Sequence, residues 1–500
     1  MNTIPPAYAG PATRQETEWK LSSGSSRAHW YPRGRPVQLA RIAETLSPSQ
    51  VVGDAQVEIA DLAYDTRAVA PGALFFCVRG SRFDGHDLAE RALEAGAAAL
   101  VVERPVASRV PQLVVADVRE AMATAAAEFF GHPTEELEIA GVTGTNGKTT
   151  TAFLLHSILE AAGRKPGLIG TIESRVGGER RPAVRTTPEA IDLQRSFREM
   201  LDAGDRSCAM EATSHGSAFN RLDGIRFASL AFTNLTQDHL DLHGTMEAYF
   251  EAKRRLFVET RPLAAINVGD PWGRRLAEER PDALTYGFAD DATIRPNALD
   301  GIDLKLKGRF NVENALAAMA SAQLLGIEAD AVARGLEALD GVPGRFETVD
   351  EGQPFTVVVD YAHTPDSLEN VLTTARELDA GRVICVFGCG GDRDREKRPM
   401  MGRIASDLAD IAIVTSDNPR SEDPRAIIDA IVTGTEGELE IVPDRREAIA
   451  RAIETAAVGD VVLIAGKGHE QGQQFGDRTV PFDDREVARE ALRRLGAATS

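Results

Sequence analysis

The chain has 500 residues, of which 43% are hydrophobic and 26% are charged. This composition is typical of a globular protein, and the length is too great for a single hydrophobic core. Asp and Glu number 76 against 56 Lys and Arg, so the net charge is −20. That acidic balance argues against nucleic acid or an anionic membrane surface as a partner.

The four cysteines are scattered, so neither a zinc site nor a disulfide framework is expected. No apolar run reaches the ~18 residues that a membrane helix needs, and we expect no stable membrane insertion. Residues 1–36 are rich in Pro, Ser, Gly and Arg, without the apolar stretch of a signal peptide. We interpret them as a disordered extension of a cytoplasmic enzyme.

Residues 37–137 mix short strands with helices. An apolar run at 73–78 predicts a strand, residues 87–94 predict a helix that ends near Gly96, and 98–102 predicts the next strand. We interpret this part as a small α/β domain.

Residues 138–345 begin with an apolar strand at 137–142. A glycine-rich turn follows, and then a helix is predicted over 149–162, with Gly163 as its stop signal. Further strands alternate with helices as far as Ala318. This alternation predicts a parallel sheet with helices on both faces.

Residues 346–500 contain four apolar runs of strand length with helical stretches between them. Such runs are typical of buried parallel strands, so we expect a Rossmann-like domain. The runs lie at 356–360, 383–388, 411–414 and 461–465. Ligands of such folds bind beyond the carboxyl ends of the strands. Polar clusters follow the strands at 361–363, 390–393, 417–420 and 467–470. Overall we predict a three-domain α/β protein.

The glycine-rich turn has the features of a phosphate-binding loop. Five residues separate Gly141 from Gly147, where the strict motif has four, yet the strand before and the helix after are those the motif requires. Glycines let backbone N–H groups face an anion, a lysine adds a charge and a hydroxyl can bind Mg²⁺. The predicted ATP-binding residues here are Gly144, Thr145, Asn146, Gly147, Lys148, Thr149 and Thr150. The alternative is a turn with an incidental lysine.

This loop resembles that of the Mur ligase and folylpolyglutamate synthetase superfamily, and the resemblance extends over most of residues 60–490. Within the family the chain is most similar to the MurE type. The motifs that carry the resemblance lie at 64–67, 186–188, 210–216, 233–241, 308–314 and 360–365. The resemblance implies an ATP-dependent ligase that adds meso-diaminopimelate to UDP-N-acetylmuramoyl-L-alanyl-D-glutamate through an acyl phosphate, in peptidoglycan biosynthesis.

The resemblance also implies a magnesium site. It places Thr149, Glu211 and His239 around the metal, with Lys148, Glu211, His239 and Lys253 as the catalytic residues. From the sequence alone Lys253 reads as a surface lysine on an amphipathic helix. In the family the lysine at this position is carbamylated, and a carbamate would help to bind Mg²⁺. Since carbamylation needs an uncharged amine, we expect partial burial of Lys253.

Three residues resemble the family's contacts with the nucleoside of ATP. Asn311 matches the adenine contact, whereas Arg345 and Asp360 match the ribose and phosphate contacts. An asparagine at this position could equally be a helix N-cap.

The nucleotide-sugar peptide is expected to contact the first and central domains. The first-domain residues that match family contacts are Tyr64, Thr66, Arg67, Ser81, Arg82 and Phe83. Those of the central domain are Thr186, Thr187, Thr213 and Arg221. Many relatives have serine where this chain has Thr213, and the hydroxyl is retained.

The incoming amino acid is expected to bind the third domain. The residues that match the diaminopimelate-adding pattern are Arg393, Asp417, Asn418, Pro419, Arg420, Gly466 and Glu470. Diaminopimelate differs from lysine by a far carboxylate, which a planar guanidinium can bind through two hydrogen bonds. Glu470 would take the far ammonium. The alternative for 417–420 is an ordinary Asn-Pro turn.

Besides Thr213, two further departures from the family pattern are visible. Glu396 stands where glycine is common, and the 20 residues between Gly287 and Gly308 are fewer than usual, so we expect a trimmed peripheral hairpin there. We expect a monomer. The alternative functions are ligation of L-lysine, folylpolyglutamate synthesis, and a nucleotide-binding switch without catalysis.

Overall fold

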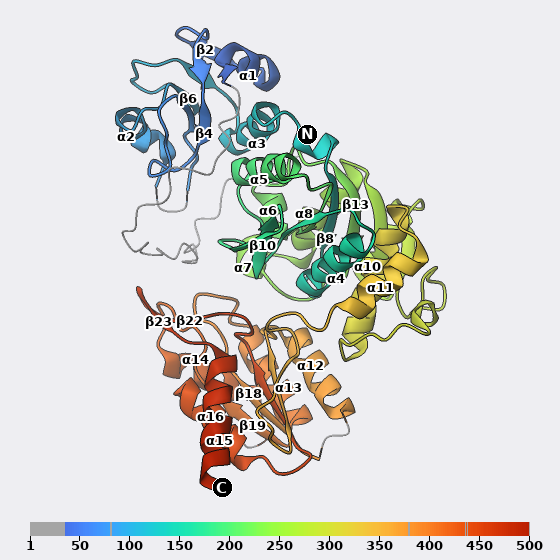
Figure 1. Ribbon diagram of the computed structural model, residues 1–500. Coiled ribbons are helices and arrows are strands. Elements are labelled where there is room, and N and C mark those ends of the chain that lie inside the picture. The colour runs from blue at the N-terminus through green and yellow to red at the C-terminus, as the bar shows by residue number, and fades with distance from the viewer. Residues whose placement is uncertain (1–35, 81–82, 379–380, 436, 438, 500) are drawn as a thin grey trace.

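The computed structural model describes residues 36–80, 83–378, 381–435, 437 and 439–499. The expected extension over 1–36 therefore lies outside the described residues, apart from residue 36. The chain forms three lobes in a row, each built on its own sheet (Figure 1). The three-domain α/β prediction is confirmed, and we propose 37–137, 138–345 and 346–500 as the domains.

The first lobe contains a five-stranded sheet of order β2-β7-β6-β5-β4, in which only β2 runs antiparallel to its neighbour. Its strands are β2 (Gln50–Val52), β4 (Asp61–Ala63), β5 (Ala73–Phe76), β6 (Ala99–Val102) and β7 (Gln112–Val114), with β1 (Val37–Gln38) and β3 (Glu58–Ile59) pairing separately. Helices α1 (Leu39–Leu46) and α3 (Val118–Phe129) cover one face, and α2 (Ala89–Glu94) covers the other. The helix predicted at 87–94 is divided, because its first turn is the 3-10 helix η1 (Gly85–Leu88).

The central lobe contains an eight-stranded sheet of order β11-β10-β9-β12-β8-β13-β14-β15. Its strands are β8 (Glu138–Thr143), β9 (Pro166–Ile169), β10 (Glu173–Val176), β11 (Glu179–Pro182), β12 (Ser207–Glu211), β13 (Phe227–Phe232), β14 (Leu263–Asn267) and β15 (Leu284–Tyr286). Six neighbouring strands are parallel, as predicted, and their order is β9-β12-β8-β13-β14-β15. The remaining two, β10 and β11, form an antiparallel edge beside β9.

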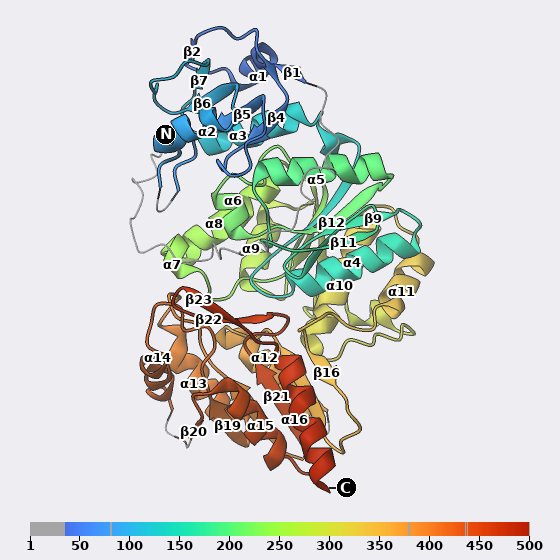
Figure 2. The ribbon, with the colours of Figure 1, turned by 60° about the vertical axis from the view of Figure 1, so that its left-hand side comes forward.

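Helices cover both faces of this central sheet (Figure 2). One face packs against α4 (Lys148–Ala161), α10 (Arg309–Leu324) and α11 (Ala329–Ala338). The other packs against α5 (Ala190–Ala203), α8 (Met246–Val258) and α9 (Pro271–Glu279), with the short α6 (Ser214–Ala218) and α7 (Leu240–His243) nearby. Residues 288–307 contain the 3-10 helix η3 (Pro296–Leu299) and one isolated bridge in place of a hairpin. A further 3-10 helix, η2 (Pro133–Glu135), precedes β8.

The third lobe contains a six-stranded sheet of order β16-β17-β21-β18-β19-β20, parallel except for β16. Its strands are β16 (Glu347–Val349), β17 (Thr356–Asp360), β18 (Val383–Phe387), β19 (Ile411–Val414), β20 (Glu440–Ile441) and β21 (Val461–Ala465). Helices α12 (Pro365–Glu377), α13 (Lys397–Leu408) and α14 (Pro424–Val432) cover one face, and α15 (Arg445–Thr455) and α16 (Asp484–Thr499) cover the other. The hairpin of β22 (Gly472–Phe475) and β23 (Arg478–Pro481) lies on the side that faces the central lobe.

Helix starts in this protein follow local rules. Asp117 caps α3 by accepting from two backbone N–H groups, and Thr364 and Ser367 form a capping box at α12. Glu396 is the residue before α13, with φ −67°. Because this is an ordinary right-handed conformation, glycine is not required there.

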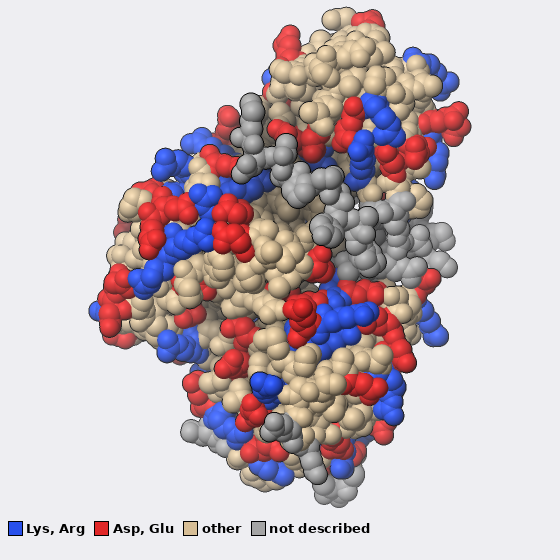
Figure 3. Space-filling view, turned by 180° about the vertical axis from the view of Figure 1, so that it is seen from behind, with Lys and Arg blue, Asp and Glu red and all other residues tan. Residues whose placement is uncertain are grey.

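The surface charges, the cysteines and the longer helices have the following features. On the face in Figure 3, acidic and basic side chains are interspersed over all three lobes. The four cysteines are buried and free. In the part of the chain that the structure describes, no helix is both long and apolar enough to span a membrane.

Candidate active site

The loop between β8 and α4 requires its two glycines. Gly144 and Gly147 have φ of 151° and 86°, which side chains rarely adopt. A Cβ atom at Gly144 would overlap the Thr233 hydroxyl, and one at Gly147 would overlap the amide oxygen of Asn314. The backbone can therefore pass close to β13 and α10 only because both positions lack a side chain.

The end of β13 fixes the shape of this loop. The N–H of Thr145 donates to the Asn234 carbonyl at 2.9 Å, and the N–H of Asn146 donates to the Asn234 side chain at 2.9 Å. The Thr233 hydroxyl donates to the Asn146 carbonyl at 2.6 Å. The loop thus keeps its conformation through contacts with residues that lie almost ninety positions away.

Two lysines, the partly buried Lys148 and the buried Lys253, converge on the loop. The ammonium of Lys148 donates to the carbonyls of Gly144 and Thr145 at 3.0 and 2.8 Å, and that of Lys253 donates to Gly144 at 2.8 Å. Lys253 is 1% exposed and lies over the Tyr249 ring. Burial, together with the charge of Lys148, holds the pKa of Lys253 well below its ordinary value. The burial expected for Lys253 is present.

Glu211, at the end of β12, is joined directly to the start of α4. Its carboxylate accepts from the Thr149 hydroxyl at 3.0 Å, and from the N–H and hydroxyl of Thr171 at 2.7 and 3.0 Å. The Arg345 guanidinium donates to the Thr149 hydroxyl at 3.1 Å. A hydroxyl and a carboxylate, both suited to Mg²⁺, therefore lie in contact beside the loop.

His239 lies apart from this pair. It forms a contact of 3.3 Å with Asp238, and its ring is 4.5 Å from that of His215. Burial lowers the pKa of His239 well below its usual value. Within the described residues no three His, Cys, Asp or Glu side chains are grouped to hold a metal ion. A hydrogen bond joins Thr149 to Glu211, and none in the described part of the chain joins His239 to this pair.

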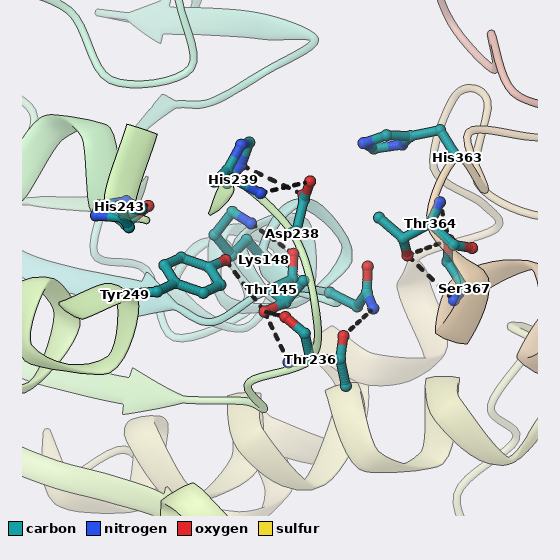
Figure 4. Close-up of polar contacts among 12 residues, drawn as sticks. Thr145, Lys148, Thr236, Asp238, His239, His243, Tyr249, His363, Thr364 and Ser367 are labelled. Atoms are coloured by element: carbon teal, nitrogen blue, oxygen red, sulfur yellow. Dashed lines mark hydrogen bonds and ion pairs between the residues drawn. The ribbon is translucent and has the colours of Figure 1, made fainter. Parts of the chain in front are cut away.

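Figure 4 shows the residues on both sides of the gap between the central and third lobes. His363, from the loop after β17, faces Asp238 and His239 across this gap. The side chain of Asn146 crosses it and donates to Asp366 of α12 at 2.6 Å. The phosphate loop is therefore in direct contact with the third lobe.

The residues predicted to contact the nucleoside have structural partners of their own. Asp360 accepts from the N–H groups of Phe346 and Ala362, each at 2.7 Å, and burial raises its pKa. Asn311 bonds to Lys307 and Asn314. Because the residue before α10 is Gly308, Asn311 is not the helix N-cap.

The central-lobe residues predicted to bind the peptide form one hydrogen-bonded group with Glu211. The Thr187 hydroxyl donates to the Glu211 carbonyl at 2.9 Å and accepts from the Thr213 hydroxyl at 3.0 Å. Arg221 donates to the Thr187 carbonyl at 3.2 Å, and Thr186 is 3.0 Å from Thr171. The peptide-site residues therefore adjoin the phosphate loop.

The first-lobe residues are less closely grouped. Tyr64 donates to Asp192 of α5 at 2.6 Å and so joins the first lobe to the central one. Arg67 pairs with Asp65, Thr66 lies beside them, and the side chain of Phe83 is largely exposed. Ser81 and Arg82 lie outside the described residues.

The residues predicted to bind diaminopimelate follow the carboxyl ends of β18, β19 and β21. Asn418 donates to Glu470 at 2.8 Å, and the buried Lys467 donates to both side chains at 3.0 Å. A Cβ atom at Gly466 would be 2.6 Å from the Asp417 carboxylate, so glycine is needed there. The charges of Lys467, Arg445 and Arg420 outweigh burial and lower the pKa of Asp417.

Arg420 completes this group through an unusual backbone conformation. Its φ is 53°, and the β22–β23 hairpin holds it, because Arg420 N–H donates to the Gln474 carbonyl at 3.1 Å and Gly476 N–H donates to the Arg420 carbonyl at 2.6 Å. Burial and the neighbouring charge of Arg420 lower the pKa of Arg393. The two guanidiniums therefore lie near one another.

Sequence reasoning missed three residues of the site: Thr171, Asp366 and Lys467. Asp366 and Lys467 lie in polar segments that follow strands, which was the available signal. Thr171 had no signal of this kind. Its contact with Glu211 depends on the neighbouring positions of β9 and β12 in the sheet.

A phosphate loop contacted by two lysines, faced by a lobe that gathers charged side chains at its strand ends, defines a P-loop ligase. Three family models match the chain: "Mur ligase family, catalytic domain" at 58–130, "Mur ligase middle domain" at 142–322 and "Mur ligase, glutamate ligase domain" at 344–468. The chain belongs to the Mur ligase family.

Curated relatives and solved structures agree with this assignment. The UDP-N-acetylmuramoyl-L-alanyl-D-glutamate–2,6-diaminopimelate ligase of Geobacillus thermodenitrificans is 48% identical over 465 residues, covering 87% of this chain and 95% of the relative. That of Solibacter usitatus is 47% identical, covering 88% and 95%. A solved structure of a ligase of the same name is 32% identical with a TM-score of 0.64, covering 92% of this chain and all of that one. The MurF ligase of Thermotoga maritima in complex with ADP, at 19% identity, TM-score 0.61 and coverage of 88% and 98%, shares the fold.

Proposed function

We propose that the protein joins meso-diaminopimelate to UDP-N-acetylmuramoyl-L-alanyl-D-glutamate, using ATP and Mg²⁺, in peptidoglycan biosynthesis. The relatives that are 47–48% identical over nearly their whole length carry the name of this reaction. The observation that carries the choice of amino acid is the pair of guanidiniums at Arg393 and Arg420. Among the described residues, no carboxylate lies within ion-pair distance of either, so the pair suits the far carboxylate of diaminopimelate.

The phosphate loop supports ATP binding. Lys148 lies within the loop, and the N-terminus of α4 directs its positive dipole end toward the same place. The donor set of the Thr149 hydroxyl and the Glu211 carboxylate suits a hard cation, so these two residues would hold Mg²⁺. The bound ion would neutralise charge on the transferring phosphate. His239 remains a proposed ligand on the strength of the family resemblance.

We propose that Lys253 is carbamylated. Its amine lone pair would attack the carbon of CO₂, an N–C bond would form and the nitrogen would lose a proton, leaving an anionic carbamate. The reaction needs a neutral amine, and the depressed pKa of Lys253 supplies it. Exchange of the ammonium for an anion would also remove the repulsion from Lys148.

The reaction proceeds in two steps. A γ-carboxylate oxygen of the D-glutamate attacks the terminal phosphorus of ATP and ADP leaves, and then the diaminopimelate amine attacks the acyl carbon and phosphate leaves. The amine proton passes to a phosphate oxygen, since the site offers no compelling general base. Lys148 would hold the phosphates, and the third lobe would exclude water from the acyl phosphate.

The decisive experiment measures ADP release with the UDP-linked dipeptide and either meso-diaminopimelate or L-lysine. Release that depends on the dipeptide and is much faster with diaminopimelate supports the proposal. Equal rates with the two amino acids would contradict the inference that the two guanidiniums select diaminopimelate. Release with a folate substrate instead of the dipeptide would favour the folylpolyglutamate synthetase branch.

We further propose that the enzyme is a cytoplasmic monomer. Four free, buried cysteines suit a reducing compartment. Light scattering after size exclusion should give a mass near 53.8 kDa, and a mass of twice that value would overturn the monomer.

A further inference from the structure

The amino-acid site has an acidic part at Glu470 and a basic part at Arg393 and Arg420. The two parts differ in whether an opposite charge of the protein is in contact with them. Glu470, which is predicted to take the far ammonium, is 3.0 Å from the Lys467 ammonium, and Asn418 donates to the same oxygen at 2.8 Å. Lys467 is fully buried, so this cation remains within the protein. The carboxylate of Glu470 thus has a permanent counter-ion.

In the described part of the chain, neither guanidinium forms an ion pair with a carboxylate. Arg420 donates to the Gly391 carbonyl at 2.6 Å and Arg393 to the Asp392 carbonyl at 3.2 Å, both neutral acceptors. Arg420 is also buried, and its Nε has no hydrogen-bond partner in the described part of the chain. Two neighbouring guanidiniums with no carboxylate in direct contact favour a ligand that brings one.

We propose that the site binds the far carboxylate of the incoming amino acid strongly and the far ammonium only weakly, and that Lys467 causes this difference. The accepted substrate class would then include 2-aminopimelate, which keeps the far carboxylate and lacks the far ammonium. Lys467 is a specificity-determining residue that acts through Glu470 and Asn418. This inference rests on the proposed function.

The first test uses the unmodified enzyme and compares kcat/KM for meso-diaminopimelate, 2-aminopimelate and L-lysine by ADP release. We expect 2-aminopimelate within about tenfold of diaminopimelate, and lysine lower by about 10²-fold or more, the scale expected when a charged site loses its partner. Rejection of 2-aminopimelate as strong as that of lysine overturns the proposal. Activity with diaminopimelate itself tests the proposed function separately.

The second test uses Lys467→Met, which removes the counter-ion of Glu470. We expect the preference for diaminopimelate over 2-aminopimelate to rise about tenfold or more, because the uncompensated carboxylate then attracts the far ammonium. An unchanged preference overturns the role of Lys467. Lys467→Arg keeps the charge and should keep the original preference, and Lys305→Met, at an exposed lysine of the central lobe, serves as the matched control. The KM for ATP should stay unchanged in all three, which a general loss of structure would not allow.

Discussion

The contact between Asn146 and Asp366 predicts that the third lobe helps to hold the phosphate loop. Asn146 lies in the loop and Asp366 in the first turn of α12, 220 residues further on, yet the amide donates to the carboxylate at 2.6 Å. Replacing Asp366 with Ala removes this acceptor and leaves the loop with its contacts within the central lobe. The change should therefore weaken ATP binding without disturbing the amino-acid site.

The size of the effect follows from the type of bond. A hydrogen bond to a charged group contributes about 1.5–3 kcal/mol, which corresponds to a change in affinity of roughly 10- to 150-fold. We expect the KM for ATP to rise within this range in Asp366→Ala. Asp366→Asn, which retains an acceptor oxygen, should show a smaller rise.

The assay is ADP release over a series of ATP concentrations, with the other two substrates saturating. Glu369→Ala is the matched control, because this exposed carboxylate lies one turn further along the same helix. A KM for ATP that is unchanged in Asp366→Ala would refute the coupling between α12 and the loop. A parallel rise in the KM for diaminopimelate would instead mean that the whole lobe had shifted.

Three further predictions concern other parts of the protein. Arg420→Met should lower kcat/KM for diaminopimelate by about 10²-fold or more while changing the rate with lysine much less, as measured by ADP release, and equal losses would contradict the carboxylate clamp. Lys253→Ala should be nearly inactive and partly restored by short carboxylates such as acetate, and complete failure of this rescue would count against a carbamate. Burial lowers the pKa of His156 from 6.5 to about 4, so the folded protein favours the neutral imidazole. The contribution of this residue to the free energy of unfolding is therefore fully present above pH ~6.5 and is lost as the pH falls toward 4. The thermal midpoint of His156→Gln should therefore fall less between pH 7 and pH 5 than that of the unmodified protein, and equal falls would contradict this.

Local sequence determined much of this protein. The phosphate loop is readable because its glycines, lysine and threonine are adjacent, and because the strand before it and the helix after it have clear apolar patterns. The parallel strands of the third lobe are continuous apolar runs, since both of their faces are buried. The cluster at 417–420 is likewise contiguous, so the residue types needed for a carboxylate site are visible together.

Only the tertiary structure decided which side chains meet. The sequence around Lys253 is that of a solvent-facing helix, yet packing of α8 against the loop buries its amine against Gly144. Asn146 and Asp366 are joined because two lobes face each other, and Asn418 meets Lys467 and Glu470 because the ends of β19 and β21 converge. Such contacts depend on where strands and lobes lie relative to one another, and no local pattern encodes that position. The sequence therefore determined which chemical groups are available at the site, and the packing of the lobes decided which of these groups contact one another.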